Sequence, residues 1–393
     1  MKLKTMLSHY GENREKNRGA VVPPIYQNSL FTFENWDAIN EAFDDPYNSN
    51  IYTRGNNPSV TMVEEKLAKL CGGERAKLFA SGMGAISSSI LHCVKCRDHI
   101  IAVKNVYGPA NNFMNEYLKE KMDIDTTFIS GESIDEFKEA IRENTSLIYL
   151  ESPSSAVFSL QNIKEVAKLA KENGIKTIID NTWATPMFQR PLEMGIDLEV
   201  HSCSKYLGGH SDIVSGVVTG REEDIKAIYE TEHALLGAKM APFEAWLLMR
   251  SLRTLPYRMR GHAENTMEVA KFLEGHSKIA RVLYPGLPSH PQYDLGNEQM
   301  SGYTGLLTFE LDTKNLEEIK SFVNTLKYFS IGVSWGGHES LIYVPAISYL
   351  RELPEDQFEA LGISLGTIRI SVGLEDSADL IKDLEGAMEH IKQ

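Results

Sequence analysis

The chain has 393 residues, of which 42% are hydrophobic and 24% charged, the proportions of an ordinary globular protein with room for two or three domains. Acidic residues outnumber basic ones 54 to 40, giving a formal net charge of −14, so nucleic acid and anionic membranes are not expected as partners. No stretch approaches the roughly 18 apolar residues of a transmembrane helix, and the first residues lack a signal-peptide apolar region. We therefore expect a cytoplasmic protein.

Residues 1–57 have little regular periodicity. Val21–Tyr26 is a proline-stiffened extended segment, and residues 44–50 are rich in turn formers. Such a segment has no core of its own. We expect an extended N-terminal arm that contacts a neighbouring subunit.

Residues 58–250 alternate between β-prone runs and amphipathic stretches. The expected strands are Ala76–Ala80, His99–Val103, Thr126–Ile129, Ser146–Leu150, Lys176–Ile179 and Leu198–His201. The expected helices lie near Ala85–Val94, Asn111–Lys121, Ser133–Arg142 and Ile163–Asn173. This alternation predicts an α/β domain with a mostly parallel sheet.

Residues 251–393 have a different pattern. A long helical region from about Ala241 to Leu273 is followed by the proline- and glycine-rich Tyr284–Pro291, and then by strands mixed with helices. We expect a smaller C-terminal α+β domain.

Cysteine and histidine patterns give no metal prediction. Cys93 and Cys96 form a C-x-x-C pair, but no second such pair follows, and we expect ordinary thiols. The spacing of His201, His210 and Asp212 fits no closed zinc pattern.

A glycine-containing turn, Ser81–Ala85, joins an expected strand to an expected helix. Gly82 and Gly84 would let backbone N–H groups at a helix start approach an anion. A plain tight turn is equally compatible with this pattern. A nicotinamide-dinucleotide site is not expected, because the third glycine of that fingerprint is missing at Ser87 and no ribose-binding acid follows the next strand.

Two strand ends carry ionisable residues. Asp180 ends an apolar strand, where a carboxylate needs a cation or strong donors, such as a protonated pyridinium nitrogen. Lys205 follows the next strand, beside Ser202 and Ser204. A desolvated lysine can form a Schiff base with an aldehyde, and the two hydroxyls could bind an ester phosphate. A turn-capping aspartate and a solvated lysine are the alternatives.

In the C-terminal part, Arg369 alternates with Ile368, Ile370 and Val372, so it lies on the opposite face of an expected strand. An arginine there could bind a carboxylate or simply face solvent. The turn that contains Ser334 could line the same cleft.

Together these segments resemble the Cys/Met-metabolism family of fold-type-I enzymes that use pyridoxal 5′-phosphate (PLP): cystathionine β-lyases, γ-lyases and γ-synthases, and methionine γ-lyases. The similarity runs from about Val21 to Asp376. It is carried by Pro24–Gln27, Tyr52–Pro58, Ser81–Ile86, Tyr107-Gly108, Asp180–Thr182, Ser204–Asp212 and Arg369–Gly373.

The resemblance implies a role for each of these residues. Lys205 forms the Schiff base and moves protons, Asp180 holds the pyridinium nitrogen, and Tyr107 stacks on the ring and assists as an acid or base. The phosphate ligands are Gly82, Met83, Ser202 and Ser204, with Tyr52 and Arg54 reaching the phosphate from a neighbouring subunit. Ser334, Arg369 and Tyr107 bind the substrate. Family members are usually homotetramers built from tight dimers.

Single positions favour β-elimination within the family. Pro109 stands where methionine γ-lyases have cysteine, and Val333 where γ-lyases and γ-synthases usually have glutamate. Ser334–Gly337 matches some cystathionine β-lyases, whereas Ser155 replaces an asparagine common in the family. The resemblance therefore predicts a PLP-dependent carbon–sulfur lyase, most specifically a cystathionine β-lyase. The alternatives are a cystathionine or methionine γ-lyase, a cystathionine γ-synthase and, outside the class, a non-catalytic protein with the same fold.

Overall fold

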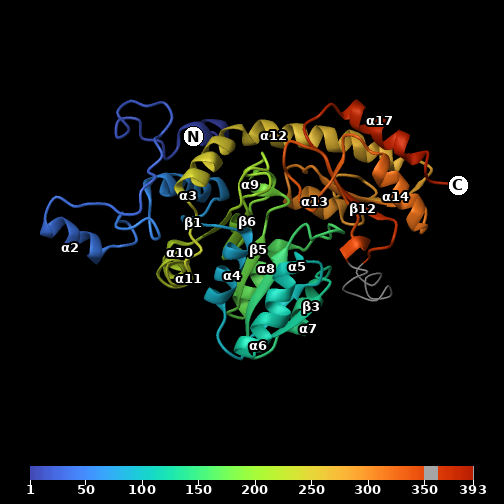
Figure 1. The fold of residues 1–393 in the computed structure, drawn as a ribbon. Helices are drawn as coiled ribbons and strands as arrows, with labels where there is room; N and C mark the ends of the chain where they lie inside the picture. Colours follow the sequence, from blue (N-terminus) through green and yellow to red (C-terminus); the bar gives the residue numbers. More distant parts are fainter. Residues whose placement is uncertain (349–361, 393) are drawn as a thin grey trace.

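The computed structural model describes residues 1–348 and 362–392. Two β-sheets and the helices around them form the molecule (Figure 1). The larger sheet has the strand order β1-β7-β6-β5-β4-β2-β3. Its strands are β1 (Arg75–Phe79), β2 (His99–Val103), β3 (Asp125–Ile129), β4 (Thr145–Glu151), β5 (Lys176–Asp180), β6 (Leu198–Ser202) and β7 (Gly216–Gly220).

The larger sheet confirms the predicted fold class. Strands β2 to β6 pair in parallel, whereas β7 runs antiparallel to both of its neighbours, β1 and β6. Each of the six expected strands lies within one residue of its observed bounds. Strand β7 was not predicted.

Helices surround this sheet. The expected Asn111–Lys121 helix is divided by a π-helical turn, Phe113–Tyr117, between α5 and α6. A second π-helical turn is Tyr229–His233. The helices are α1 (Leu3–His9), α2 (Trp36–Asp44), α3 (Pro58–Cys71), α4 (Gly82–Cys93), α5 (Gly108–Asn112), α6 (Leu118–Met122), α7 (Ile134–Ala140), α8 (Ile163–Glu172), α9 (Thr185–Phe188), α10 (Glu222–Ile228) and α11 (Ala234–Leu236).

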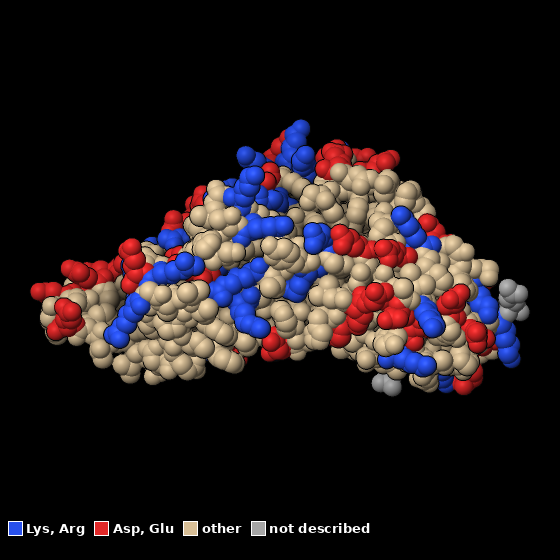
Figure 2. Space-filling model, turned by 90° about the horizontal axis from the view of Figure 1, so that it is seen from above, with Lys and Arg blue, Asp and Glu red and all other residues tan. Residues whose placement is uncertain are grey.

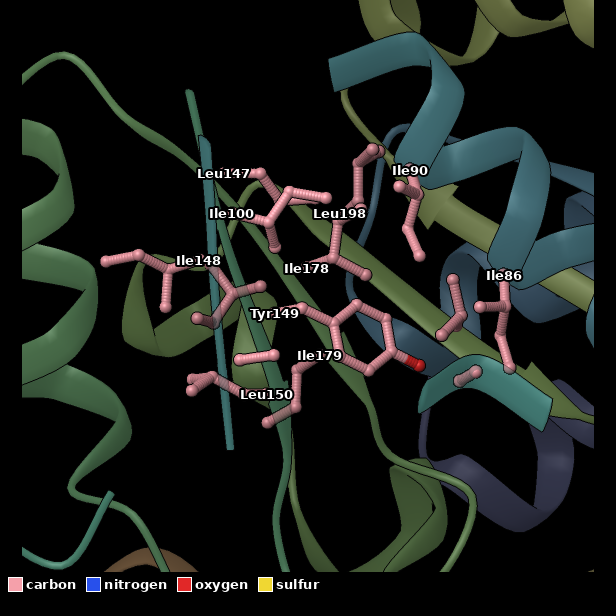
Figure 3. Packing of buried hydrophobic residues seen from close by; sticks show 14 of the residues in the cluster. Ile86, Ile90, Ile100, Leu147, Ile148, Tyr149, Leu150, Ile178, Ile179 and Leu198 are labelled. Carbon is pink, nitrogen blue, oxygen red and sulfur yellow. The ribbon is translucent and has the colours of Figure 1, made fainter. Parts of the chain in front are cut away.

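The main hydrophobic core lies between helix α4 and the larger sheet. Figure 3 shows Ile86 and Ile90 of α4 pointing toward Leu198, Ile178 and Tyr149 of the strands. All five side chains are buried. Burial of each such side chain contributes about 1.5–3 kcal/mol. This packing therefore fixes the positions of β4, β5 and β6, and with them the carboxyl ends of these strands.

The smaller sheet has the order β10-β11-β12-β9-β8 and is mostly antiparallel. Ile368 and Ile370 of β12 are fully buried and Arg369 is not, as the alternation predicted. The strands are β8 (Ile279–Leu283), β9 (Leu306–Leu311), β10 (Ser330–Ile331), β11 (Leu341–Tyr343) and β12 (Thr367–Ser371). The helices of this part are α12 (Pro242–Glu274), α13 (Tyr293–Gln299), α14 (Leu316–Thr325) and α17 (Ser377–Met388).

The long helix α12 connects the two parts of the molecule. It contacts α3 on the side of the larger sheet, and α17 and β8 on the other side (Figure 1). It also runs without a break through the expected domain boundary at residue 250. The division into residues 1–57, 58–250 and 251–393 stays a prediction.

The N-terminal segment is less extended than expected, because it contains two helices. Met6 and Leu7 of α1 are buried in a core shared with α3 and α12. Helix α2, in contrast, projects away from the body (Figure 1), and its Trp36 and Phe43 are 81% and 63% exposed. This projecting part keeps the features of an arm.

Charged side chains of both signs cover the face seen in Figure 2. Lys and Arg side chains gather near its middle, and Asp and Glu side chains lie to both sides. Among the helices within residues 1–348 and 362–392, none is long and apolar enough to cross a membrane.

Candidate active site

A cavity of ≈ 630 Å³ opens at the carboxyl ends of β4, β5 and β6. Open α/β sheets bind their ligands at this edge, and the volume suits a small cofactor with its substrate. Nine of the residues selected from the sequence line it: Gly82, Met83, Tyr107, Asp180, Ser202, Ser204, Lys205, Ser334 and Arg369.

Asp180 lies at the end of β5, inside this cavity. Its side chain is buried and accepts hydrogen bonds from the backbone N–H of Thr182, at 2.9 Å, and from the Thr182 hydroxyl, at 2.5 Å. Burial raises the pKa of Asp180, while the Thr182 bonds, His201 and Lys205 act in the opposite direction. A cation brought into the cavity beside this carboxyl would stabilise its anionic form.

Lys205 follows β6, the strand beside β5, as the sequence suggested. Its Nζ donates a hydrogen bond to the Ser334 hydroxyl at 2.6 Å and lies 5.4 Å from the centre of the Trp335 ring. Burial, helped by the positive charge of Arg369, lowers the pKa of Lys205 to about 8. At pH 7 about a tenth of this amine is therefore neutral and nucleophilic, far more than for an unperturbed lysine.

Gly336 allows the turn that carries Ser334 and Trp335 to lie close to the backbone beside Lys205. It has a φ of +83°, and a Cβ there would lie 2.9 Å from the backbone nitrogen of Tyr206. Only glycine combines this conformation with so close a contact. The turn can therefore bring Ser334 and Trp335 onto Lys205.

The amino end of α4 forms a cradle suited to a phosphate. Ser81 caps this 12-residue helix by accepting the Gly84 N–H, and the first N–H groups of a helix have no partner inside it. A Cβ on Gly82 would lie 3.0 Å from Cβ of Ser202. The Ser204 hydroxyl, in contrast, is already bonded to the backbone of Ser215.

Tyr107 directly precedes α5 at the cavity wall and is 46% exposed. Burial, with repulsion from Asp180 and Glu151, raises the pKa of its hydroxyl. Its backbone N–H donates to Glu151 at 2.7 Å. This bond fixes the backbone of Tyr107 beside the cavity that its side chain lines.

Glu151 lines the cavity, although the sequence analysis assigns it no role. It ends β4 and pairs in register with Asp180, so two buried carboxyl groups lie on adjacent strand ends. Burial, with repulsion from Asp180, raises the pKa of Glu151 to about 8, while bonds from Ser155 and Tyr107 lower it. A carboxyl group at the end of an apolar strand is the sequence feature that indicates Asp180, and Glu151 has the same feature at the end of β4.

Arg369, on β12, lines the same cavity as Lys205. Its Nη2 donates to the carbonyl of Val333 at 2.8 Å, and its guanidinium lies 4.9 Å from the centre of the Tyr343 ring. The group is held in place by its neighbours. Such a fixed guanidinium suits a carboxylate ligand.

Two selected residues lie outside this cavity. Tyr52 and Arg54 line a separate surface pocket, and Tyr52 is 51% exposed. The guanidinium of Arg54 donates to the carbonyl of Ala234. Neither residue reaches the cavity within its own chain.

Among the described residues, Cys71, Glu199 and His201 are potential metal ligands whose ligand atoms lie within 4.8 Å of one another. His210 and Asp212, whose spacing from His201 fits no closed zinc pattern, are not part of this cluster. The Nε2 of His201 is 2.7 Å from a carboxylate oxygen of Glu199, a hydrogen-bond distance. That the protein has no metal site stays a prediction.

The cavity fits PLP on its own residues. A lysine with a lowered pKa suits the aldehyde, a buried carboxyl suits a ring cation, and a glycine-lined helix start suits the phosphate. A mostly parallel α/β sheet that carries these groups at its strand ends defines a PLP-dependent enzyme of fold type I.

Comparison with known proteins identifies the family. The family model of the Cys/Met metabolism PLP-dependent enzymes matches residues 4–389, and the chain belongs to this family. PLP is therefore its cofactor. The non-catalytic alternative is not supported.

The curated relatives are lyases of sulfur amino acids. An L-methionine γ-lyase of Porphyromonas gingivalis is 41% identical over 97% of this chain and 96% of its own length. A cystathionine β-lyase of Lactococcus lactis subsp. cremoris is 37% identical over 98% of this chain and 99% of its own, and a cystathionine γ-lyase of Bacillus subtilis is 36% identical over 100% of both. The predicted class, a PLP-dependent carbon–sulfur lyase, is confirmed, and the relatives divide between β- and γ-lyases.

Proposed function

We propose that this lyase acts as a cystathionine β-lyase, which cleaves the bond between Cβ and sulfur and releases a thiol, pyruvate and ammonia. The observation that carries the proposal is the position of Lys205, whose amine is held between Ser334 and the ring of Trp335 and has a pKa lowered to about 8. One such base, acting at Cα, is sufficient for β-elimination.

Bound PLP supplies the electron sink for this reaction. Asp180 would hold the proton on the ring nitrogen of the bound cofactor, and Arg369 would bind the substrate carboxylate and orient the Cα–H bond toward Lys205. The neutral amine of Lys205 then removes that proton. Tyr107, at the edge of the cavity, assists as an acid or base near the leaving sulfur.

Val333 supports β- over γ-elimination. It lines the cavity beside Ser334 and is 80% exposed, so an apolar side chain stands at the entrance. Elimination at Cγ requires a second proton removal, at Cβ, and Val333 cannot take part in proton transfer. Pro109 and the Ser334–Gly337 turn support the same choice.

Methionine γ-lyase activity is the second candidate. A relative of that name is 41% identical to the chain, and the apolar entrance at Val333 suits an uncharged thioether side chain. A cystathionine γ-lyase would form the same type of keto acid. A cystathionine γ-synthase would instead require an activated homoserine ester and a thiol acceptor.

A keto-acid assay separates these activities. Purified enzyme is incubated in parallel with cystathionine, cysteine, homocysteine and methionine. We expect pyruvate from cystathionine as the main product. A faster release of 2-oxobutanoate, from any of these substrates, would replace the β-lyase assignment with a γ-lyase.

We also propose a cytoplasmic homotetramer in which Tyr52 and Arg54 reach the phosphate of a neighbouring subunit. Tyr52 and Arg54 do not line the cavity of their own chain, and the side chains of Trp36 and Phe43 are exposed; both observations support this arrangement. Mixing an Arg54→Ala variant with a Lys205→Ala variant tests it. Subunit exchange should restore activity, because one mixed site then has both native residues; no recovery after exchange would show that Arg54 does not act across the interface.

A further inference from the structure

A chain of buried polar side chains lies behind the cofactor cavity. The Nε2 of His201 contacts Glu199 at 2.7 Å, and the same Glu199 oxygen accepts a hydrogen bond from Asn181 at 2.8 Å. Asn181 exchanges hydrogen bonds with Gln189, at 3.0 Å in each direction, and Cys71 lies 3.9 Å from His201. All five residues are at most 1% exposed.

This chain reaches three strand ends of the larger sheet. Glu199 and His201 belong to β6, and Asn181 directly follows β5. Gln189 continues the chain by donating to the carbonyl of Ser152, the residue after β4, at 2.7 Å. The chain thus joins the three strand ends that carry the cavity's lysine and two carboxyl groups.

Alternation along β6 places Glu199 and His201 on the face opposite the cavity. Val200 packs in the α4 core, and Ser202 lies against Gly82 at the cavity, so the residues between them point the other way. In the register of β5 and β6, Asp180 pairs with Val200. Asp180 therefore faces the cavity while Asn181, the next residue, is held by Glu199 behind the sheet.

Stability alone does not account for this arrangement. One oxygen of Glu199, the Nδ1 of His201 and the side-chain oxygen of Gln189 are buried without a hydrogen-bond partner among residues 1–348 and 362–392. Unpaired buried polar atoms are unfavourable, and apolar replacements of buried ionic pairs are often as stable. A role for Glu199 and His201 in the adjacent cofactor cavity would account for their presence.

We propose that Glu199 and His201 are positioning residues that, through Asn181, hold the Asp180 carboxyl in the place where it would meet the ring nitrogen of the cofactor. The proposal rests on the role assigned to Asp180 above. Neither residue touches the cavity, so neither is catalytic.

The test compares Glu199→Gln, which keeps the shape and removes the charge, with the wild type. Apoprotein is titrated with PLP to obtain the dissociation constant, and the visible circular dichroism of the bound cofactor reports how firmly its ring is held. We expect the dissociation constant to rise by about tenfold, roughly the loss of one hydrogen bond to a charged group, and the dichroism to weaken.

His99→Asn is the matched control. His99 is also fully buried in the larger sheet and contacts two hydroxyls, those of Thr145 and Thr127, each at 2.8 Å, but it starts β2 at the opposite end of the sheet. This variant should lower the melting temperature and leave PLP binding unchanged. If Glu199→Gln behaves in the same way, the pair is only structural and the proposal is wrong.

Two further variants separate the possible failures. Asn181→Ser cuts the connection but leaves Glu199 and His201 in place; it should also weaken PLP binding, and it replaces Glu199→Gln if that variant does not fold. Asp180→Asn should weaken PLP binding more than either. If Asp180→Asn binds PLP normally, the role of Asp180 itself is wrong; if only Asp180→Asn has an effect, the positioning proposal alone fails.

Discussion

Replacing Gly82 with alanine adds a methyl group at the edge of the proposed phosphate cradle. The new Cβ would lie 3.0 Å from Cβ and 3.1 Å from Oγ of Ser202, closer than ordinary van der Waals contact. Gly82 is not in the left-handed backbone region, so alanine is compatible with its conformation. The change therefore acts on the cradle and leaves helix α4 intact.

The expected loss can be estimated from the hydrogen bonds at risk. A shift of a few tenths of an ångström between Gly82 and Ser202 weakens a bond between a helix N–H and a phosphate, and bonds to charged groups contribute about 1.5–3 kcal/mol. That corresponds to an increase of roughly 10- to 100-fold in the PLP dissociation constant. Titration of the apoprotein with PLP, followed by the visible absorbance, measures it.

Gly84→Ala is the control in the same helical turn. Its Cβ would lie 3.4 Å from Phe79 and 3.4 Å from Ser81, at ordinary contact distance. Since alanine is a better helix former than glycine by about 1 kcal/mol, this variant should be as stable as the wild type or more so, with unchanged PLP binding. Normal PLP affinity in Gly82→Ala would refute the phosphate cradle.

Two further predictions concern the charges around the cavity. Arg369→Gln should raise the pKa of Lys205 above about 8, because the guanidinium helps to lower it, and should also raise KM for the amino acid. Arg369→Lys keeps the positive charge and should change only KM. If the pH dependence of amine labelling is the same in the wild-type and Arg369→Gln apoproteins, the predicted effect of Arg369 on Lys205 is wrong. The pKa of Glu151 rises from 4.5 to about 8 in the folded state, so the native protein binds more protons than the unfolded chain between these values, and stability falls as pH increases through that window. In urea unfolding of the apoprotein, Glu151→Gln should lose less stability between pH 5 and pH 8 than the wild type; equal losses would show that Glu151 is ionised throughout.

The strand ends of the site could be predicted because their signals are local. An apolar run that ends in Asp180, and another followed by Lys205, are visible within a few residues, and the structure has both at adjacent strands. Glu151 has the same local pattern, an apolar run that ends in a carboxyl group, so its place at the site is predictable from the sequence in the same way.

Strand β7 and the contact between Cys71 and His201 join parts of the chain that are far apart in the sequence. β7 begins with Gly216 and ends with Gly220, and glycines in a sequence indicate a turn more often than a strand. The structure explains Gly216, since a Cβ there would lie 2.3 Å from the carbonyl oxygen of Ser81. Cys71 and His201 are 130 residues apart in the chain, so no local pattern could indicate their contact.

The central claim is that Lys205 is the residue that binds the cofactor covalently. Borohydride reduction of the PLP-loaded enzyme, followed by peptide mapping, tests it most directly. We predict a pyridoxyl group on Lys205 and none on Lys205→Ala. A pyridoxyl group on any other lysine, or none after reduction of protein that has bound PLP, would contradict the account.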